Sequence, residues 1–345
     1  TTEIYTLSLH DALPIYPMRL LKLVPEDTNI HFLKWRNIAM GISFLMIVAS
    51  IVLVAVRGLN LGVDFVGGQS VRVEFSGTMP KIDEIREKVD NIGLGEATIQ
   101  QFGSDQAVSI RTALPEGDKA AADRAGKQLV DGIHKAFPTA KTGSVETVSG
   151  KVSGELLRTG ALSLALAMIA ISIYIWIRFE WQFGVGALFA LFHDVMLTFG
   201  FFALTQMQFD LNIVAALLTI IGYSLNDTIV VYDRIRENLK KYRKMEIIPL
   251  LDLSINETLA RTVMTSFTML IALAVLLWVG PDVIFGFTAA MLLGIFVGTY
   301  SSIYMSAPIL VWLKVGPDSF VPRTSAATQG AERVTSKEDD DGAVV

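Results

Sequence analysis

LNIVAALLTIIGYSLNDTIVVY, residues 211–232, has the length and composition of a membrane-spanning helix, yet it contains a carboxylate. A helix needs about 20 mostly apolar residues to cross the hydrocarbon core of a bilayer. Asp227 lies inside this run, and a charge at bilayer depth costs about 3 kcal/mol on insertion scales. Ionisable side chains inside a membrane usually face the interior of a helix bundle and have a function, so Asp227 is the first candidate functional residue.

The composition of the whole chain is that of a membrane protein. The 345 residues are 52% hydrophobic and 18% charged, with a net charge of −5. Since the chain has no cysteine, disulfide bonds and thiolate metal sites are excluded. Basic residues cluster beside apolar segments, a pattern typical of membrane topology and not of nucleic-acid binding. The sequence has no nucleotide-binding, zinc or nucleophile motif, so we expect no cofactor, no metal and no enzymatic activity.

Several segments are apolar enough to cross the bilayer, which predicts a mostly α-helical protein with six transmembrane helices. They are residues 38–56, 159–177, 182–205, 211–232, 262–280 and 283–313. The last segment is long enough to tilt or bend, and Pro308 lies near its end.

Lys and Arg in the flanks of the spans predict their orientation. Basic residues gather in residues 18–37 and 233–261, whereas the short loops at 206–210 and 281–282 have none. We therefore expect a bacterial inner-membrane protein with both termini and the 233–261 loop in the cytoplasm, and residues 57–158 in the periplasm. Within the loop, PLLDLSINETL predicts a short helix capped by Ser254, with Glu257 three residues later.

The segment between the first two spans predicts a small α+β domain. Alternating apolar residues indicate strands in QSVRVEFSG, ATIQQFG, AVSIRTAL and TGSVETVS, and helical spacing indicates helices in PKIDEIREKVDNIG and residues 117–138. The order β-α-β-β-α-β is that of a ferredoxin-like fold, with a turn at Ser104–Asp105. In GVDFVGGQ (62–69), Asp64 and the Gly67–Gly68 pair indicate a tight turn into the first strand.

The two ends of the chain are set apart from the fold. Residues 1–17, TTEIYTLSLHDALPIYP, look like an artefactual extension, and we expect the true start at Met18, although a short natural extension is the alternative. The tail, residues 314–345, becomes rich in Ser, Thr, Gly and acidic residues, which predicts a disordered cytoplasmic segment.

The first candidate site surrounds Asp227. Tyr223 and Ser224 lie on the same helical face and are candidates to hydrogen-bond its carboxyl, with Asn226 beside it and room left by Gly222. Arg261, at the start of the fifth span, is the candidate cation. A carboxyl that moves between a dry site and a site near Arg would bind and release a proton. The alternatives are a hydrated Asp227 near the cytoplasmic end and an Arg261 that only anchors its helix.

The second candidate site interrupts the third span with His193 and Asp194. Asp194 lies in line with Gly186, Ala190 and Thr198, a stripe of small residues that predicts an inward-facing carboxyl suited to a proton relay. His193 is either a relay or a packing histidine, and we favour packing.

The sixth span has small residues at four-residue spacing. They are Gly286, Ala290, Gly294, Gly298, Ser302 and Ser306. This spacing predicts close packing against another helix, either of this chain or of another protein.

Four motifs carry a family resemblance. They are GVDFVGGQ (62–69), GYSLNDTIVVYDRIREN (222–238), SINETLARTVMTS (254–266) and GIFVGTYSSIYMSAPIL (294–310). Over residues 18–315 the chain resembles SecF, of the SecD/SecF family of protein-export membrane proteins in the RND superfamily. The resemblance implies SecD, the SecYEG channel and an unfolded translocating polypeptide as partners. It also implies that the proton gradient drives late steps of export, with proton passage at Asp227 and Arg261.

Two other functions remain open from the sequence. A proton-coupled RND-type exporter of small molecules or lipids would need a roomy apolar pocket in the outer domain. A scaffold that transports nothing would use the intramembrane charges only for helix pairing, and neutral isosteres would then be tolerated.

Overall fold

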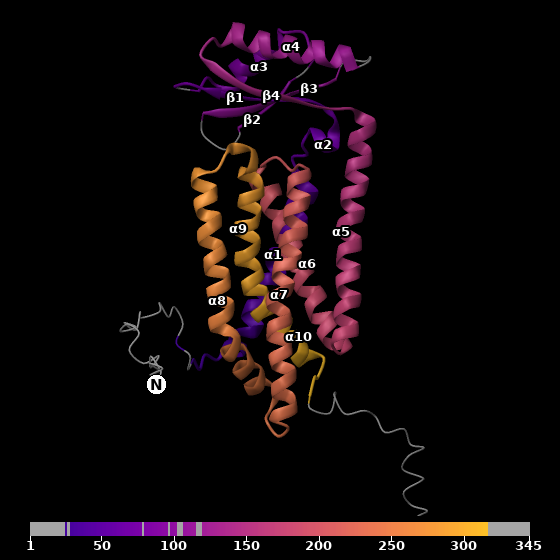
Figure 1. Ribbon diagram of the computed structural model, residues 1–345, viewed down its shortest axis with the longest axis vertical. Helices are drawn as coiled ribbons and strands as arrows, with labels where there is room; N and C mark the ends of the chain where they lie inside the picture. Colours follow the sequence, from indigo (N-terminus) through magenta and orange to yellow (C-terminus); the bar gives the residue numbers. More distant parts are fainter. Residues whose placement is uncertain are drawn as a thin grey trace, which may run out of the picture.

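The protein consists of a helical bundle with a small sheet domain at one end (Figure 1). The computed structural model describes residues 25, 28–77, 79–95, 97–101, 106–114 and 119–316. The expectations for residues 1–17, for the tail from residue 317 onward and for the Ser104–Asp105 turn lie outside these residues. Both ends of the described chain lie at the end of the bundle away from the sheet domain, called here the far end.

Within the described residues, six helices are long and apolar enough to cross a membrane. They are α1 (Arg36–Arg57), preceded by the 3-10 turn η2 (Phe32–Trp35), α5 (Gly150–Arg178), α6 (Trp181–Thr205), α7 (Leu211–Lys241), α8 (Ile247–Val279) and α9 (Phe285–Ser301). The sixth span begins with the 3-10 turn η3 (Asp282–Ile284) and continues through a π-helical turn, η4 (Ser302–Ser306), into α10 (Ala307–Trp312). The predicted irregularity near Pro308 is therefore this π-turn, because a proline has no amide to donate back along the helix.

Several helices run beyond the spans that hydropathy predicts. The expected connector before the second span is already helix from Gly150, and the expected 233–261 loop shortens to residues 242–246. The predicted short helix with a Ser254 cap is wrong, because this stretch is continuous with α8. Ser254 is buried inside α8 and donates to the Leu250 carbonyl at 2.8 Å. Both helices, α7 and α8, extend beyond their predicted spans and contact each other there. Here Asn238 of α7 donates to the Ser254 hydroxyl at 3.0 Å.

The sheet domain has the predicted ferredoxin-like topology. Its elements are β1 (Gly68–Phe75), α3 (Ile82–Asp90), β2 (Thr98–Gln101), β3 (Ala107–Thr112), α4 (Lys119–Ala136) and β4 (Ala140–Val148). The strand order is β2-β3-β1-β4, and all pairs are antiparallel. The helices cover the face turned away from the bundle (Figure 1). Val71, Ile110 and Leu129 are fully buried between the two layers.

The chain between α1 and β1 holds the sheet domain on the bundle. Leu61 pairs with Phe209, in the turn between α6 and α7, as an isolated β-bridge. Asn60 donates to the Gln206 carbonyl at 2.7 Å and to the Gln100 side chain of β2 at 2.6 Å. The guanidinium of Arg111, on β3, donates to the Leu61 carbonyl. These bonds join the domain to the α6–α7 turn.

The GVDFVGGQ motif forms more than the predicted tight turn. Val63–Val66 is a single helical turn, α2, and the glycine pair follows it with positive φ angles of 79° at Gly67 and 118° at Gly68. A Cβ at Gly68 would lie 2.7 Å from the Thr112 carbonyl oxygen, so a side chain has no room there. Asp64 accepts from the Leu211 amide at 3.0 Å and thereby helps to cap α7.

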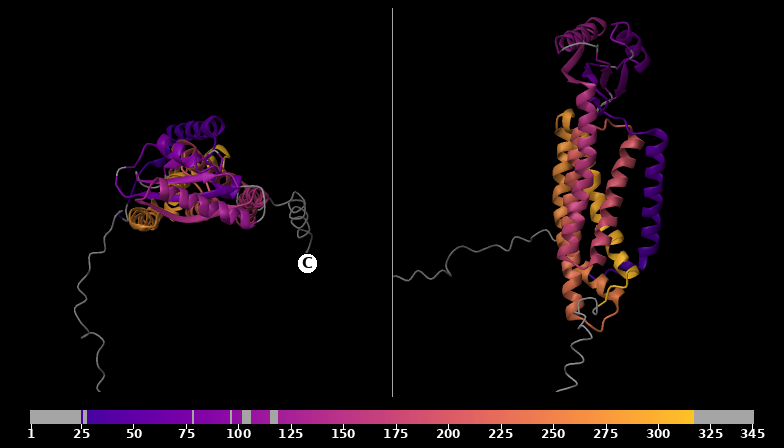
Figure 2. Two further views of the ribbon diagram at one scale, coloured as in Figure 1. Left: turned by 90° about the horizontal axis from the view of Figure 1, so that it is seen from above. Right: turned by 90° about the vertical axis from the view of Figure 1, so that its right-hand side faces the viewer.

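The predicted small-residue ladder of the sixth span packs against α7 of the same chain. A Cβ at Gly298 would lie 3.1 Å from Ser224 Cβ, and one at Gly294 would clash with the Ile220 side chain. At Gly286 the nearest atom is Ile213 Cδ1, at an ordinary 3.4 Å. Figure 2 shows α1 on the opposite side of the bundle from α8, with α6 and α9 between them. Ser224 and Asp227 of α7 and Ser301 of α9 are buried inside the bundle.

Candidate functional site: two buried carboxylates

Asp227 lies inside the bundle, where two hydroxyl groups hold its carboxylate. Its exposed fraction is 7%. Thr262 Oγ1 of α8 donates to Oδ1 at 2.7 Å, and Ser302 Oγ of η4 donates to Oδ2 at 2.9 Å. The predicted burial of Asp227 is therefore found in the structure, and the carboxylate joins three helical segments.

The α7 residues that we expected to hydrogen-bond Asp227 have other partners. Ser224 donates to Asp194 instead, and the Tyr223 hydroxyl donates to Ser266 of α8 at 3.4 Å. Asn226 and Gly222 are exposed. The expected bonds from Tyr223 and Ser224 fail because neighbouring helices occupy that face of α7 and offer closer partners.

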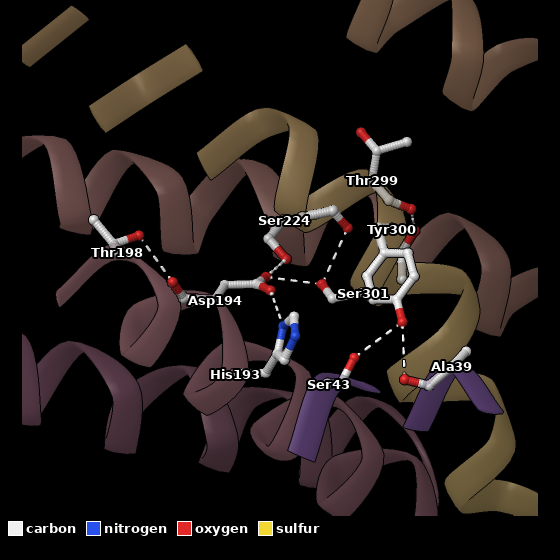
Figure 3. A network of polar contacts seen from close by, with 11 residues as sticks. Ala39, Ser43, His193, Asp194, Thr198, Ser224, Thr299, Tyr300 and Ser301 are labelled. Carbon is white, nitrogen blue, oxygen red and sulfur yellow. Dashed lines mark hydrogen bonds and ion pairs between the residues drawn. The ribbon is translucent and has the colours of Figure 1, made fainter. Parts of the chain in front are cut away.

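Asp194 is the second buried carboxylate, and its exposed fraction is 0%. Oδ2 accepts from Ser224 Oγ of α7 at 2.5 Å and from Ser301 Oγ of α9 at 2.9 Å (Figure 3). Its inward direction follows from the small-residue stripe of α6. A Cβ at Gly186 would lie 2.9 Å from the Ser306 carbonyl, so only glycine lets the helices approach there.

His193 both packs against a neighbouring ring and contacts Asp194. Its ring is fully buried, and Nδ1 lies 2.9 Å from Asp194 Oδ1. The ring packs against Tyr300 at a centroid distance of 6.1 Å. Tyr300 in turn donates to the Ala39 carbonyl and accepts from Ser43 of α1, so the network reaches a fourth helix (Figure 3). Nε2 of His193 has no hydrogen-bond partner among the described residues.

Arg261 does not touch Asp227. Its side chain is on the exposed face of α8, and among the described residues the structure has no ion pair between the two. The residue that reaches the carboxylate is the next one, Thr262, because one step along a helix turns a side chain by about 100°.

The two buried carboxylates are groups that can bind protons, and their neighbours are mainly hydroxyl donors. A buried carboxylate without a contacting cation keeps an uncompensated charge that hydroxyl donors relieve only in part. Proton binding removes that charge and turns one carboxyl oxygen into a donor. Such a change alters every hydrogen bond to Asp194 or Asp227, and those bonds come from α6, α7, α8, α9 and η4.

Sequence reasoning missed the hydroxyl donors Thr262, Ser301 and Ser302. Ser302 was present only as a step of the packing ladder, and Thr262 as the residue after a candidate cation. A usable signal exists for the serines, because two adjacent hydroxyls in an apolar span need partners once they are buried.

Known proteins match both the bundle and the sheet domain. The family described as "Protein export membrane protein SecD/SecF, C-terminal" matches residues 129–316, and the "SecD/SecF GG Motif" matches residues 52–79. "Protein translocase subunit SecF" of Rhodobacter capsulatus is 47% identical over 305 residues, which cover 85% of this chain and 91% of the relative. The SecF of Cereibacter sphaeroides is 43% identical over 317 residues, 90% of this chain and 98% of the relative.

Solved structures agree with the sequence relatives. The crystal structure of SecDF, a translocon-associated membrane protein from Thermus thermophilus, matches with a TM-score of 0.76 and 32% identity over 85% of this chain. SecDF in its super-membrane-facing form matches with a TM-score of 0.62 and 31% identity over 89% of this chain. This chain spans 40% of the length of either SecDF chain.

A ferredoxin-like domain inserted after the first of six apolar helices, with carboxylates buried between those helices, defines an RND-type membrane transport subunit. The chain belongs to the SecD/SecF family of protein-export membrane proteins. Its relatives are SecF subunits, which makes it a multi-pass inner-membrane protein with an accessory, non-catalytic role in the Sec translocase.

Proposed function

We propose that this chain uses the proton gradient to assist late steps of protein export, together with SecD and the SecYEG channel. The cargo is an unfolded polypeptide that emerges from the channel. The observation that supports this most is the position of Asp227, which is buried between helices and held by hydroxyls of α8 and η4. One proton that crosses the membrane releases about 2.3 kcal/mol per 100 mV.

Asp227 is the primary proton-binding group, and Arg261 is the cation that acts on it. Protonation of the carboxyl weakens its attraction to Arg261 and changes the two hydroxyl bonds, so two helix arrangements exchange. Asp194, with His193 bonded to it, is the second carboxyl of the relay. The chemistry is proton binding without a covalent step, and ATP hydrolysis belongs to a separate motor.

Two connections between the bundle and the sheet domain would transmit movement of the helices. α5 is one continuous helix from Arg178 to Gly150, and Gly150 lies against Gly67, where a Cβ on Gly67 would be 3.1 Å away. The bonds of Asn60 and Arg111 join the domain to the α6–α7 turn. Two rigid attachments on different helices would tilt the domain when those helices move relative to each other.

The basic flanks support an orientation with the sheet domain in the periplasm and both termini in the cytoplasm. Lys34, Arg36, Lys240 and Lys241 all belong to the far end of the bundle. In this orientation the domain meets the polypeptide as it leaves the channel.

A small-molecule exporter receives no support from the sheet domain. Its interior is filled by packed aliphatic and aromatic side chains. A groove of about 670 Å³ between α3 and α4 lies on the outside of this domain, and its lining includes the charged residues Lys88, Arg124 and Asp131.

The test compares Asp227→Asn with Asp233→Asn in cells that depend on this chain for export. Asp233 is a matched control on the same helix, 62% exposed and ion-paired with Arg178. We expect D227N to remove gradient-dependent export, measured by pulse labelling of a secreted protein, and D233N to keep it. If D227N exports at the wild-type rate, the proposal is wrong. Arg261→Lys is a milder change, because Lys keeps the charge and loses the planar fork.

A further inference from the structure

Two consecutive serines of the sixth span hold the two buried carboxylates. Ser301, the last residue of α9, donates to Asp194 Oδ2 at 2.9 Å. Ser302, the first residue of η4, donates to Asp227 Oδ2 at 2.9 Å. The carboxylates belong to different helices, and their donors are joined by a single peptide bond.

Each serine has a second acceptor within reach. Ser301 Oγ lies 3.1 Å from the Gly298 carbonyl, and Ser302 Oγ lies 2.9 Å from the Thr299 carbonyl. A hydroxyl has one proton to donate, so it bonds either to the carboxylate or to its own helix. When a carboxyl gains a proton it becomes a donor itself, and the serine proton then turns to the backbone carbonyl.

The two serines cannot move independently. Consecutive Cα atoms are about 3.8 Å apart and are linked by a planar peptide, so a shift that takes Ser302 away from Asp227 also moves Ser301 relative to Asp194. The junction between α9 and the π-turn is where such a shift is easiest, because π-turns are a local departure from the regular helix. The hydroxyl of Ser306 satisfies the Ser302 carbonyl at 2.5 Å, so a side chain supports the turn where an amide normally would.

We propose that Ser301 and Ser302 are positioning residues that couple proton binding at Asp194 to proton binding at Asp227 through the start of η4. This inference rests on the proposed proton-driven function. The two carboxyls then act as one unit, and a proton on either changes the hydrogen bonds of the other. Ser224 supports the same coupling, because it donates to Asp194 from α7, one turn before Asp227.

The charged and titratable groups that face this unit come from three helices. His193 of α6 contacts Asp194, and Tyr300 of α9 packs on the His193 ring. On α8 the charged residue beside the Thr262 donor is Arg261, whose side chain is exposed. Ser301 and Ser302 themselves do not titrate, so their removal alters the pH response only through the carboxyls they hold.

The experiment measures proton uptake against pH in proteoliposomes that contain this chain with SecD. Ser301→Ala and Ser302→Ala each remove a donor to an ionised carboxylate, so the proton stays bound to higher pH. We expect each to raise the pH midpoint of uptake by about one pH unit. The matched control is Ser172→Ala, because Ser172 Oγ donates only to the Met168 carbonyl of its own helix α5. S172A keeps the wild-type midpoint.

A second arm tests the coupling itself. Asp194→Asn is expected to shift the midpoint of the remaining carboxyl in the wild-type background, and this shift disappears when Ser301 and Ser302 are both alanine. If the shift has the same size in both backgrounds, or if S301A and S302A match S172A, the coupling is overturned. Co-purification with SecD and the melting temperature establish that each variant is folded, and S301A alone decides the first arm if S302A does not assemble. D227N separates the two claims, because normal uptake in D227N refutes the proton-driven function as a whole.

Discussion

Ser301 and Ser302 follow one another in the chain, yet their hydroxyls donate to carboxylates on two different helices, Asp194 of α6 and Asp227 of α7. The sixth span is therefore a shared hydrogen-bond donor for both proton-binding candidates. Because glycines of the same span bring it against α7, close packing and the polar network depend on each other.

Thr262→Val should impair the response of Asp227 to pH. Valine keeps the shape of threonine and removes the hydroxyl that donates to Oδ1 at 2.7 Å. We expect the pH midpoint of proton uptake to rise by about one pH unit, since hydrogen bonds to ionised groups are among the stronger ones. Thr265→Val is the control, because Thr265 is exposed and bonds only to carbonyls of its own helix. Equal midpoints in the two variants would show that Thr262 does not hold a titrating group.

Alanine at Gly294 should destabilise the bundle, whereas alanine at Gly286 should not. A Cβ at Gly294 meets three atoms of Ile220, one of them at 2.8 Å, but a Cβ at Gly286 makes only an ordinary contact. Overpacking of this kind costs about 1–3 kcal/mol of unfolding free energy. Unfolding in detergent measures the cost, with Gly222→Ala as an exposed reference. The packing account is refuted if G294A and G222A are equally stable.

Asn256→Ala should release the segment before α1. The Asn256 side chain accepts from the Ile30 amide and donates to the Ile30 carbonyl, both at 2.9 Å. Loss of both bonds should speed hydrogen exchange of the Ile30 amide by about tenfold to a hundredfold. Mass-spectrometric exchange measures this, and Asn226→Ala serves as a control at an exposed asparagine. Unchanged exchange in N256A would mean that other contacts hold the segment.

Asp210→Asn should change how stability depends on pH. Burial raises the pKa of Asp210 above 3.8, and the charge of Asp64 raises it further. A raised folded-state pKa gives stability that is present below the unfolded pKa of 3.8 and is lost as the pH rises through the folded pKa. Asparagine still caps α7 and does not titrate. As the pH rises from 3.8 to neutral, wild type should therefore lose unfolding free energy that D210N keeps.

The control for this prediction is Asp123→Asn, an exposed carboxyl on α4. D123N should follow the wild-type curve over the same pH range. A constant difference between D210N and wild type at every pH would contradict the linkage argument.

The sequence predicted the number of spans and the sheet topology because both depend on periodicity. Runs of about 20 apolar residues and strict alternation are strong local signals. The ends of the helices were less predictable. Charged residues after Asp227 led us to expect the end of the span near residue 232, but the helical hydrogen bonds of α7 continue to Lys241.

Site residues that place a charge in an apolar run could be predicted from the sequence. Site residues that place only a hydroxyl there could not. Asp227 and Asp194 are conspicuous because burial of a charge is costly, whereas Thr262 and Ser302 resemble the small residues that any tight helix pair uses. The partner of Ser224 depended on which helix packs against α7. Helix packing is part of the tertiary structure, and residue spacing within one helix does not predict it.

The most direct measurement is infrared difference spectroscopy of the complex with SecD, titrated with pH in a bilayer. The carboxylic-acid carbonyl band of a protonated side chain reports the state of Asp227 without a transport assay. We predict that the pH-dependent band has a component in wild type that is missing in D227N, where Asp194 still contributes, while the exposed-site variant D233N keeps that component. A wild-type spectrum identical to that of D227N at every pH would mean that this carboxyl does not exchange a proton, and the account would be wrong.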